Sequence, residues 1–316
     1  MFEVSVRKMT WLLRQLKKLV ATESRYKDKI DKIASIHGNV FNEFAEWTPL
    51  KLVFLHYVLA IYTAIIHKYF KHMYYVDLFA GSGINKTKKG KYCLIGSPFI
   101  AVLNHSDKYD KFFFCERNAD FAEVLDKRLD AIDITNKQVF PKDCNLEIDK
   151  ILAEIKDVRD KHILFFIDPF ALDFNWKSMQ KVLETRSDII FTFMTTQIVR
   201  AWKSALARPG YDTEKLNALY GDTSWKKAVE FSDLLGIYKE NILNIRKKGI
   251  IETVEVKGNG FHYHVLFITT ETKGGNKWLG GIKTAKKEIE QNSEDAVRVS
   301  LEIIARKQSE LSTFCN

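Results

Sequence analysis

The sequence predicts an α/β fold in which a mostly parallel sheet ends in an antiparallel hairpin and a helical N-terminal extension precedes the sheet. Four short apolar runs, at residues 73–80, 111–116, 162–170 and 188–194, alternate with helical stretches. Continuous apolar strands separated by helices are typical of a parallel sheet that is covered on both faces. Two further runs flank a turn at residues 257–260, as the strands of a hairpin do.

The composition indicates a globular protein. With 316 residues, of which 46% are hydrophobic, the chain is long enough for one large domain or two modest ones, and a disordered chain is excluded. The net charge of +9 favours a polyanionic partner such as nucleic acid, although an ordinary Lys-rich surface gives the same excess. Four cysteines without a CxxC pair argue against a disulfide framework and a zinc ribbon. We therefore expect a reducing, cytoplasmic compartment, in keeping with an N-terminus that lacks a secretory signal.

The first 70 residues have the pattern of helices. Leu12, Leu16 and Leu19 share one helical face, opposite a basic face. The stretch 52–66 is almost wholly apolar, but its 15 residues fall short of the roughly 20 that a membrane-spanning helix needs. We therefore expect a buried helix here and no membrane association.

The remaining helices follow from the segments between and after the strands. They are expected at residues 97–105, 119–132 and 145–158, and a longer polar helical stretch is expected at 197–248. Ser97 and Pro98 have the residue types of an N-cap and a first helical turn. The expected organisation is a helical extension over residues 1–70, an α/β domain over 71–282 and a C-terminal helix over 283–316.

A glycine turn follows the first strand directly. Its residues are Asp77, Leu78, Phe79, Ala80, Gly81, Ser82 and Gly83. Glycine permits a sharp turn and lets a ligand approach the backbone, because no Cβ is in the way. The third glycine of a dinucleotide fingerprint is missing, and no P-loop signature is present. A glycine turn in some other α/β fold is the alternative to a binding loop.

The pattern DxFxGxG after a first strand resembles motif I of S-adenosylmethionine (SAM) methyltransferases, notably those that act on nucleic-acid bases. The resemblance implies a Rossmann-like class I methyltransferase fold with SAM as its cofactor. It also implies that Asp77, Phe79, Ala80, Gly81 and Gly83 contribute to the SAM site.

Two further acidic residues follow the second and third strands. Glu116 ends the second strand, where a carboxylate can accept hydrogen bonds from both ribose hydroxyls of an adenosine. Asp143, within residues 140–144, follows a further probable strand, the third along the chain, so that the run at 162–170 is the fourth; such folds contact the adenine amino group at this position. The alternatives are a solvated carboxylate at a strand end for Glu116 and a turn aspartate for Asp143.

The fourth strand ends in Asp168-Pro169-Phe170. A carboxylate beside so many apolar residues is costly unless it has a partner or a function. The arrangement resembles the Asp/Asn-Pro-Pro-aromatic motif of adenine-N6 and cytosine-N4 methyltransferases. In that motif the carboxylate and the proline carbonyl accept hydrogen bonds from the exocyclic amino group, and the aromatic ring stacks on the extruded base.

The resemblance implies that Asp168, Pro169 and Phe170 are catalytic. The second proline of the motif is missing here, so Phe170, Phe174 and Trp176 all stay open as the stacking residue. The alternative is an Asp-Pro turn with a purely structural role.

The motifs together resemble one family. YYVDLFAGSG, GSPFIAV, FFFCERN, LFFIDPFAL and FTFM, in this order within about residues 47–270, are similar to the three-Cys-motif partner (TcmP) proteins. Members of this family are regarded as SAM-dependent methyltransferase-like proteins and are named after a neighbouring protein with three cysteines. Their usual spelling of the last motif is Asp-Pro-Phe-Gly, from which Ala171 departs. The resemblance implies a three-Cys-motif protein as a partner but names no substrate.

The function expected from the sequence is transfer of a methyl group from SAM to an exocyclic amino nitrogen, of the adenine N6 or cytosine N4 type, in DNA or RNA. Such a transfer requires no metal. Two alternatives stay open: a non-catalytic SAM-binding subunit of a three-Cys-motif protein, and a methyltransferase of a small molecule or a protein.

Two surface features are left over. His262 and His264 lie on one face of a strand, and with no third ligand nearby a packing role is favoured over metal binding. A Lys-rich insert follows the glycine turn and contains Lys86, Lys88, Lys89 and Lys91. It is expected either to contact phosphates or to be an ordinary solvated loop.

Overall fold

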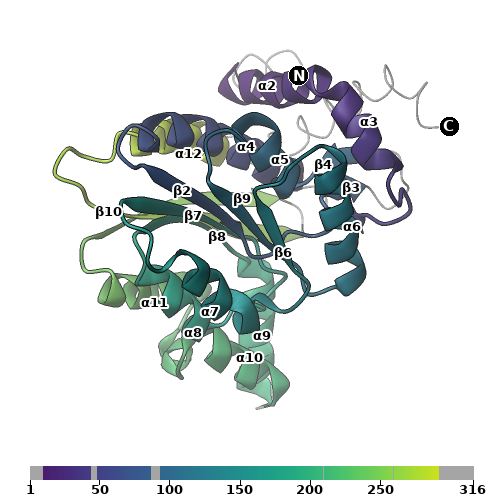
Figure 1. Ribbon diagram of the computed structural model, residues 1–316. Helices are drawn as coiled ribbons and strands as arrows, with labels where there is room; N and C mark the ends of the chain where they lie inside the picture. The colour runs from purple at the N-terminus through teal and green to yellow at the C-terminus, as the bar shows by residue number, and fades with distance from the viewer. Residues whose placement is uncertain (1–9, 44–47, 87–92, 209, 259, 292–316) are drawn as a thin grey trace.

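A seven-stranded sheet forms the centre of the computed structural model, which describes residues 10–43, 48–86, 93–208, 210–258 and 260–291 (Figure 1). In spatial order the strands are β6 (Lys137–Phe140), β5 (Lys111–Cys115), β2 (His72–Asp77), β7 (Lys161–Ile167), β8 (Ser187–Phe193), β10 (Phe261–Thr270) and β9 (Gly249–Gly258). Neighbours from β6 to β8 are parallel, and β10 runs antiparallel to β8 and to β9.

This strand order confirms the predicted fold class. The first strand of the sheet along the chain, β2, lies between β5 and β7, and a single reversed strand lies next to one edge. That is the arrangement of the Rossmann-like class I methyltransferase fold. The chain reverses its direction of travel across the sheet at β2, and in such sheets ligands bind outside the carboxyl ends of the strands at this point.

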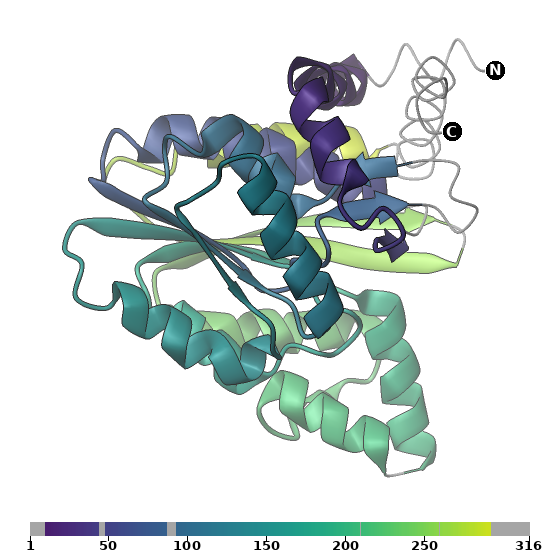
Figure 2. The ribbon, with the colours of Figure 1, turned by 45° about the vertical axis from the view of Figure 1, so that its right-hand side comes forward.

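Helices cover both faces of the sheet, as Figures 1 and 2 show. One layer contains α4 (Thr48–Ile66), α5 (Ser97–His105), α6 (Ala119–Ala131) and α12 (Leu279–Glu290). The opposite layer contains α7 (Cys144–Ile155), α8 (Trp176–Leu183), α9 (Thr195–Ala207), α10 (Tyr211–Tyr220), the 3-10 helix η1 (Ser224–Lys227) and α11 (Phe231–Ile245). Because the central parallel strands β5, β2 and β7 are buried on both sides, their sequences are mainly apolar rather than alternating, whereas β6 at the edge is only half-buried.

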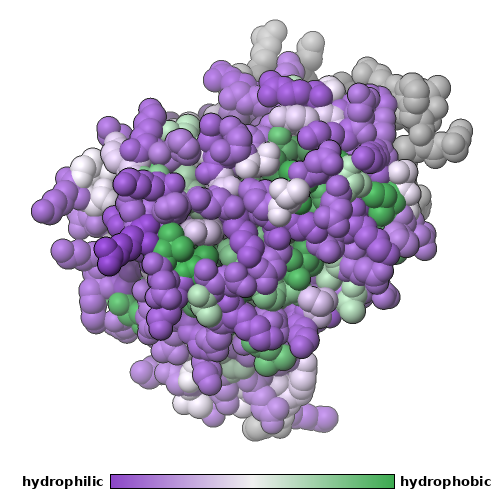
Figure 3. Space-filling model, in the orientation of Figure 1, coloured by the Kyte–Doolittle hydropathy of each residue, from purple (hydrophilic) through white to green (hydrophobic). Residues whose placement is uncertain are grey.

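Helix α4 is a core helix. It is the one described helix that is long and apolar enough to cross a membrane, and 67% of its apolar window is buried inside the protein. The ring of Phe54 lies 6.1 Å from that of Phe267 on β10. The buried helix predicted at residues 52–66 is therefore confirmed, and the face of the molecule in Figure 3 is mainly hydrophilic. Because α4 and β10 share one core, that core includes residues ahead of the boundary expected at residue 70.

Two helices at the N-terminus lie outside this layer. α2 (Thr10–Arg25) packs on α4 and α12, and α3 (Lys27–Ser35) packs on α6. The leucines predicted to share one face of the first helix are buried in this contact. Helix α12 begins at Leu279, ahead of the predicted start at residue 283, and packs on β9. The rest of the predicted C-terminal helix, residues 292–316, lies outside the described residues.

A second, small sheet connects the N-terminal segment to the glycine turn. It contains β1 (Asn42–Glu43), β3 (Ile84–Lys86) and β4 (Cys93–Ile95), in the order β1-β3-β4. Lys86 donates a hydrogen bond to the carbonyl of Gly38 at 2.9 Å, so this lysine of the insert has a structural contact. Lys88, Lys89 and Lys91 lie outside the described residues.

Candidate active site

The glycine turn adopts a backbone that only glycine adopts easily. Gly81 has φ +63° and Gly83 has φ +80°. A Cβ on Gly83 would lie 2.4 Å from the ring of Phe99, and one on Gly81 would lie 2.5 Å from Asn42 Oδ1. Each position is therefore fixed by its left-handed conformation and by a neighbouring side chain of the chain itself. The protein's own packing, before any ligand is considered, requires both glycines.

Asp77 at the end of β2 is fully buried. Its Oδ1 accepts a hydrogen bond from the Phe79 amide at 3.2 Å, whereas Oδ2 has no hydrogen-bond partner among the described residues. Burial raises the pKa of Asp77 to about 7, and the nearby Ser97 hydroxyl and the Phe79 amide oppose that rise. A buried carboxylate oxygen without a partner is costly, which makes Asp77 a natural acceptor for a donor or a cation that a ligand supplies.

The hydroxyl of Ser97 does not cap the helix that it begins. Ser97 is the first residue of α5, whose N-cap residue is Gly96 and whose N-terminus has no side-chain cap hydrogen bond. The predicted capping role of Ser97 is therefore wrong. The residue types at residues 96–98 fit either register of a helix start, so sequence alone did not separate them.

Glu116 supports the glycine turn. It follows β5, and its Oε2 accepts a hydrogen bond from the Gly81 amide at 2.9 Å while its Oε1 accepts one from the Asn118 amide at 2.8 Å. Each carboxylate oxygen has a second lone pair, so both can still accept a hydrogen bond from a ligand. Glu116 therefore holds the turn and faces the cavity at the same time.

Asp143 is an N-cap residue. Its Oδ1 accepts hydrogen bonds from the Asn145 amide at 2.8 Å and from Asn145 Nδ2 at 2.9 Å, at the start of α7. The alternative expected from the sequence, a structural aspartate in a turn, is thus present in the fold. Asp143 also lines the cavity, so it can contact a ligand while it caps the helix.

Asp168, directly after β7, forms an ion pair that the sequence did not reveal. Both of its carboxylate oxygens accept hydrogen bonds from Lys51 Nζ, at 2.6 and 2.9 Å. The Lys51 side chain is only 10% exposed and that of Asp168 is 25% exposed. Lys51 lies in the first turn of α4, and its amine lies 5.3 Å from the ring centroid of Tyr263.

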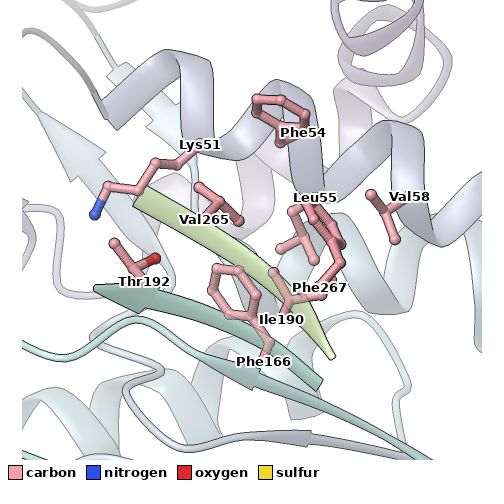
Figure 4. A pocket seen from close by; sticks show the side chains of 9 residues that line it. All are labelled: Lys51, Phe54, Leu55, Val58, Phe166, Ile190, Thr192, Val265 and Phe267. Atoms are coloured by element: carbon pink, nitrogen blue, oxygen red, sulfur yellow. The ribbon is translucent and has the colours of Figure 1, made fainter. Parts of the chain in front are cut away.

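Figure 4 shows how Lys51 reaches this position. Its aliphatic stem runs along an apolar seam between α4 and the sheet, beside Val265, and its amine projects past Thr192 toward the sheet edge. The one signal in the sequence was a lysine at the start of an otherwise apolar helix, because a charge there needs a buried partner.

The three aromatic residues after Asp168 differ sharply in exposure. Phe170 is 76% exposed and lines the cavity, whereas Phe174 and Trp176 are buried. Phe174 packs against Phe79, with 6.2 Å between ring centroids. Ala171 has φ +57°, a left-handed conformation that suits the glycine of the resembled family better. Of the three aromatic residues, Phe170 is therefore the one that a ligand can reach.

One cavity of about 360 Å³ brings these residues together. It is lined by Asn42, Leu78, Phe79, Glu116, Arg117, Asn118, Phe121, Asp143, Cys144, Asp168, Phe170 and Asp173. Of the residues singled out from the sequence, Asp77, Ala80, Gly81, Gly83 and Pro169 do not line the cavity directly. The first four belong to the end of β2 and the turn that supports it.

Asn42 is a cavity residue that sequence reasoning missed. Its Oδ1 accepts hydrogen bonds from the Ser82 amide at 2.7 Å and from Ser82 Oγ at 2.9 Å. The side chain thus covers the glycine turn from the N-terminal segment, 40 residues earlier in the chain. A single asparagine in a polar stretch carries no recognisable sequence signal.

Arg128 on α6 holds this segment in place. Its fully buried guanidinium donates hydrogen bonds to the carbonyls of Ser82 at 2.7 Å, Ile36 at 2.9 Å, Val40 at 2.8 Å and His37 at 3.1 Å. Burial lowers the pKa of Arg128 to about 10, which leaves it charged at neutral pH. One side chain therefore joins the N-terminal segment to the glycine turn.

No family model and no curated sequence matches the chain. Among solved structures, LPL1258 from Legionella pneumophila, a DUF519 protein, has a TM-score of 0.47 at 12% identity and covers 74% of this chain and 90% of its own. The O-methyltransferase TomG from Streptomyces achromogenes, in complex with SAM, has a TM-score of 0.38 at 11% identity over 81% and 89%. An rRNA methylase from Streptococcus thermophilus has a TM-score of 0.34 at 8% identity over 66% and 93%. The resemblance to the TcmP family stays a prediction from motifs.

Proposed function

We propose that this protein is a SAM-dependent methyltransferase. The observation that carries the proposal is the convergence of four acidic residues at one edge of a class I methyltransferase sheet. Asp77, Glu116, Asp143 and Asp168 follow the adjacent strands β2, β5, β6 and β7, and the last three line one cavity at the chain's switch point. Ligands of open α/β sheets bind at this edge.

The residues fit SAM in chemical type. Glu116 has lone pairs free for the ribose hydroxyls, and Asp143 lies beside it for the adenine amino group. Phe79 and Phe121 offer apolar surface to the adenine ring. Asp77 is buried behind the cavity lining, so its contribution would be to hold the glycine turn by accepting a hydrogen bond from the Phe79 amide. When bound, SAM supplies an electrophilic methyl group on its sulfonium.

We further propose an exocyclic amino nitrogen of a base in DNA or RNA as the methyl acceptor. Lys51 uses one lone pair of each Asp168 oxygen, so the carboxylate can still accept a hydrogen bond from an amino group. The exposed ring of Phe170 is available to stack on a base. The net charge of +9 favours a polyanionic substrate.

In the proposed reaction the protein contributes mainly by positioning the acceptor nitrogen and the methyl group. Asp168 and the Pro169 carbonyl would orient the amino nitrogen toward the methyl group and polarise it, while Lys51 holds the Asp168 carboxylate in a fixed geometry. No metal ion is needed for the transfer itself.

A second candidate is a SAM-binding subunit that has no turnover of its own. The exposed Phe170 beside the cavity favours it as well, because an exposed aromatic ring also suits contact with a partner protein, such as the three-Cys-motif protein that the family resemblance implies. A cytoplasmic location agrees with both candidates, since Cys115 and Cys144 carry free thiols.

Two experiments test the proposal. Calorimetry measures binding of SAM and S-adenosylhomocysteine. Nucleic acid is then incubated with the protein and labelled SAM, and its nucleosides are analysed by mass spectrometry. We expect saturable binding of both compounds and a labelled N-methyl nucleoside. If SAM binds but no methyl group is transferred to DNA, RNA, protein or small molecules, the result supports the non-catalytic subunit. Absence of binding to folded protein contradicts both candidates.

A further inference from the structure

A second cluster of ligand-type side chains lies on the hairpin of β9 and β10, outside the cavity lining. The carboxylate of Glu255 on β9 and the imidazoles of His262 and His264 on β10 have ligand atoms that all lie within 4.8 Å of one another. None of these three residues lines the cavity at the switch point. The sequence had set the two histidines aside because no third ligand was close to them in the chain.

The antiparallel register supplies that third ligand. Glu255 pairs directly with His264, and His262 lies two residues along on the same face of β10. All three side chains therefore project from one face of the hairpin. This is a juxtaposition that pairing creates and that spacing along the chain does not reveal.

The contacts of the cluster leave one imidazole nitrogen unsatisfied, although Glu255 Oε2 also accepts a hydrogen bond from Lys257 Nζ at 3.5 Å. His262 Nε2 lies 2.9 Å from Glu255 Oε1, yet this nitrogen is buried without a well-formed hydrogen bond to any described residue. The imidazole rings of His262 and His264 lie 4.7 Å apart, so two positive charges on these rings would repel each other. Two imidazoles and a carboxylate that face one another without complete hydrogen bonding are better satisfied by a shared cation.

A fourth residue orients the more buried histidine. Thr195, the first residue of α9, forms a hydrogen bond of 2.7 Å with His264 Nδ1. Metal-bound histidines typically have such a partner on the nitrogen that does not bind the metal, and it fixes the orientation of the ring. With Nδ1 engaged, Nε2 of His264 is the nitrogen that is free to bind.

From this geometry we infer a binding site for a divalent transition-metal ion of the zinc type, with Glu255, His262 and His264 as its protein ligands. Two histidines and one carboxylate are an established ligand set for zinc, with a water in the fourth position. Around a tetrahedral zinc ion, ligand atoms lie roughly 3.3 Å apart, so small side-chain rotations close the present spacing. The Glu255 side chain is 35% exposed, which leaves room for the water.

The bound ion would fasten the hairpin to the start of α9. Tyr263 lies between the two histidines, on the opposite face of β10, where its ring lies under the Lys51 amine. The ion would thus stiffen the strand beside the Lys51–Asp168 pair without taking part in methyl transfer. The site is separate from the proposed activity, and its test does not depend on that activity.

The test uses tag-free protein of residues 1–316 that has been treated with a chelator and dialysed. The protein is titrated with Co²⁺ while visible absorption is recorded. Zn²⁺ is then added to compete with Co²⁺. We expect saturation at a single ion per chain, with the absorption of a four-coordinate site, and displacement by Zn²⁺. Glu255→Gln and His262→Asn should each weaken Co²⁺ binding by about tenfold or more, because each removes a direct ligand. Zn²⁺ should raise the Tm of the wild type and not that of either variant.

The matched control is His72→Asn. His72 Nδ1 pairs with Asp110 Oδ1 at 2.9 Å, so it is also a histidine beside a carboxylate, but it belongs to no three-ligand cluster among the described residues. Co²⁺ binding should be unchanged in this variant. Binding that does not saturate at a single ion, or that is equally tight in Glu255→Gln and His262→Asn, overturns the inference and leaves an ordinary Glu–His pair. Circular dichroism confirms that the variants compared are folded.

Discussion

Lys51 and Asp168 lie 117 residues apart in the chain, yet the Lys51 amine donates a hydrogen bond to each carboxylate oxygen of Asp168. The pair ties the start of α4 to the carboxyl end of β7, at the edge of the sheet where the cavity opens. A partly buried ion pair of this kind is not strong evidence for stability, because desolvation offsets much of the attraction. Its value here lies in fixing the geometry of one carboxylate.

Replacement of Lys51 tests this positioning role. We expect Lys51→Met to lower the single-turnover methyl-transfer rate by about tenfold or more, while SAM affinity stays within a few-fold, because the Asp168 carboxylate loses the partner that orients it. Lys51→Arg should retain more activity, since a guanidinium can also bind both oxygens. Equal rates in Lys51→Met and the wild type would show that the pair is only structural.

Replacement of Asp168 separates catalysis from cofactor binding. Asp168→Ala should lower the transfer rate by about 100-fold or more and leave SAM affinity within a few-fold, because it removes a positioned acceptor. Asp168→Asn, whose amide oxygen still accepts a hydrogen bond, should retain measurable activity. Because Asp168→Ala also strands the Lys51 amine, the double variant Lys51→Met/Asp168→Ala serves as control. Wild-type rates in Asp168→Ala would contradict the amino-methyltransferase proposal.

Phe170→Ala tests stacking on the acceptor. The side chain is largely exposed, so the free energy of unfolding should change by less than about 0.5 kcal/mol. Activity on nucleic acid should fall several-fold, and SAM binding should not change. Tyr69→Ala, which removes another exposed aromatic ring that does not line the cavity, should leave activity intact. Equal activity of both variants would remove Phe170 from the acceptor site.

Asp77 should make stability depend on pH. Its pKa rises from 3.8 to about 7 in the folded protein, so the folded state binds this proton more tightly than the unfolded chain does. Stabilisation by the protonated form is therefore lost as pH rises from the unfolded pKa of 3.8 to the folded pKa of about 7, by on the order of 4 kcal/mol in total. Asp188, whose pKa burial raises to about 6, acts in the same direction.

Urea unfolding at pH 5 and pH 8 measures this effect. Asp77→Asn should shrink the difference in unfolding free energy between the two pH values, and the remainder should come from groups such as Asp188. A pH dependence identical to that of the wild type would mean that Asp77 is not protonated in the folded protein at pH 5.

Gly81→Ala tests the contact between the glycine turn and Asn42. The left-handed conformation alone should cost about 1–2 kcal/mol with a Cβ present, and the close approach to the Asn42 amide should add to it. In Gly81→Ala/Asn42→Ala the contact is relieved but the conformation is not, so stability should recover in part. Chemical denaturation measures both terms. If stability does not recover in the double variant, the Asn42 side chain moves aside in Gly81→Ala without lowering the free energy of unfolding.

The sequence by itself determined the sheet, its flanking helices and the local motifs. Buried parallel strands are apolar throughout, and the glycine turn and the Asp-Pro turn each occupy a few consecutive residues, so their signals are local. The fold class followed from these runs, and the turn positions at Gly81 and Gly83 proved to be left-handed as their residue type allows. The local errors concerned helix starts, at Ser97 and at Leu279, where neighbouring registers are equally plausible.

Only the tertiary structure decided which side chains meet. The Lys51–Asp168 pair, the cover that Asn42 places over Ser82 and the Glu255–His264 pairing all join residues on different elements. Exposure was decided in the same way, since Phe170 is open to solvent while Phe174 and Trp176 are buried. Such contacts depend on how helices and strands pack after long loops close, and no periodicity along the chain records that outcome.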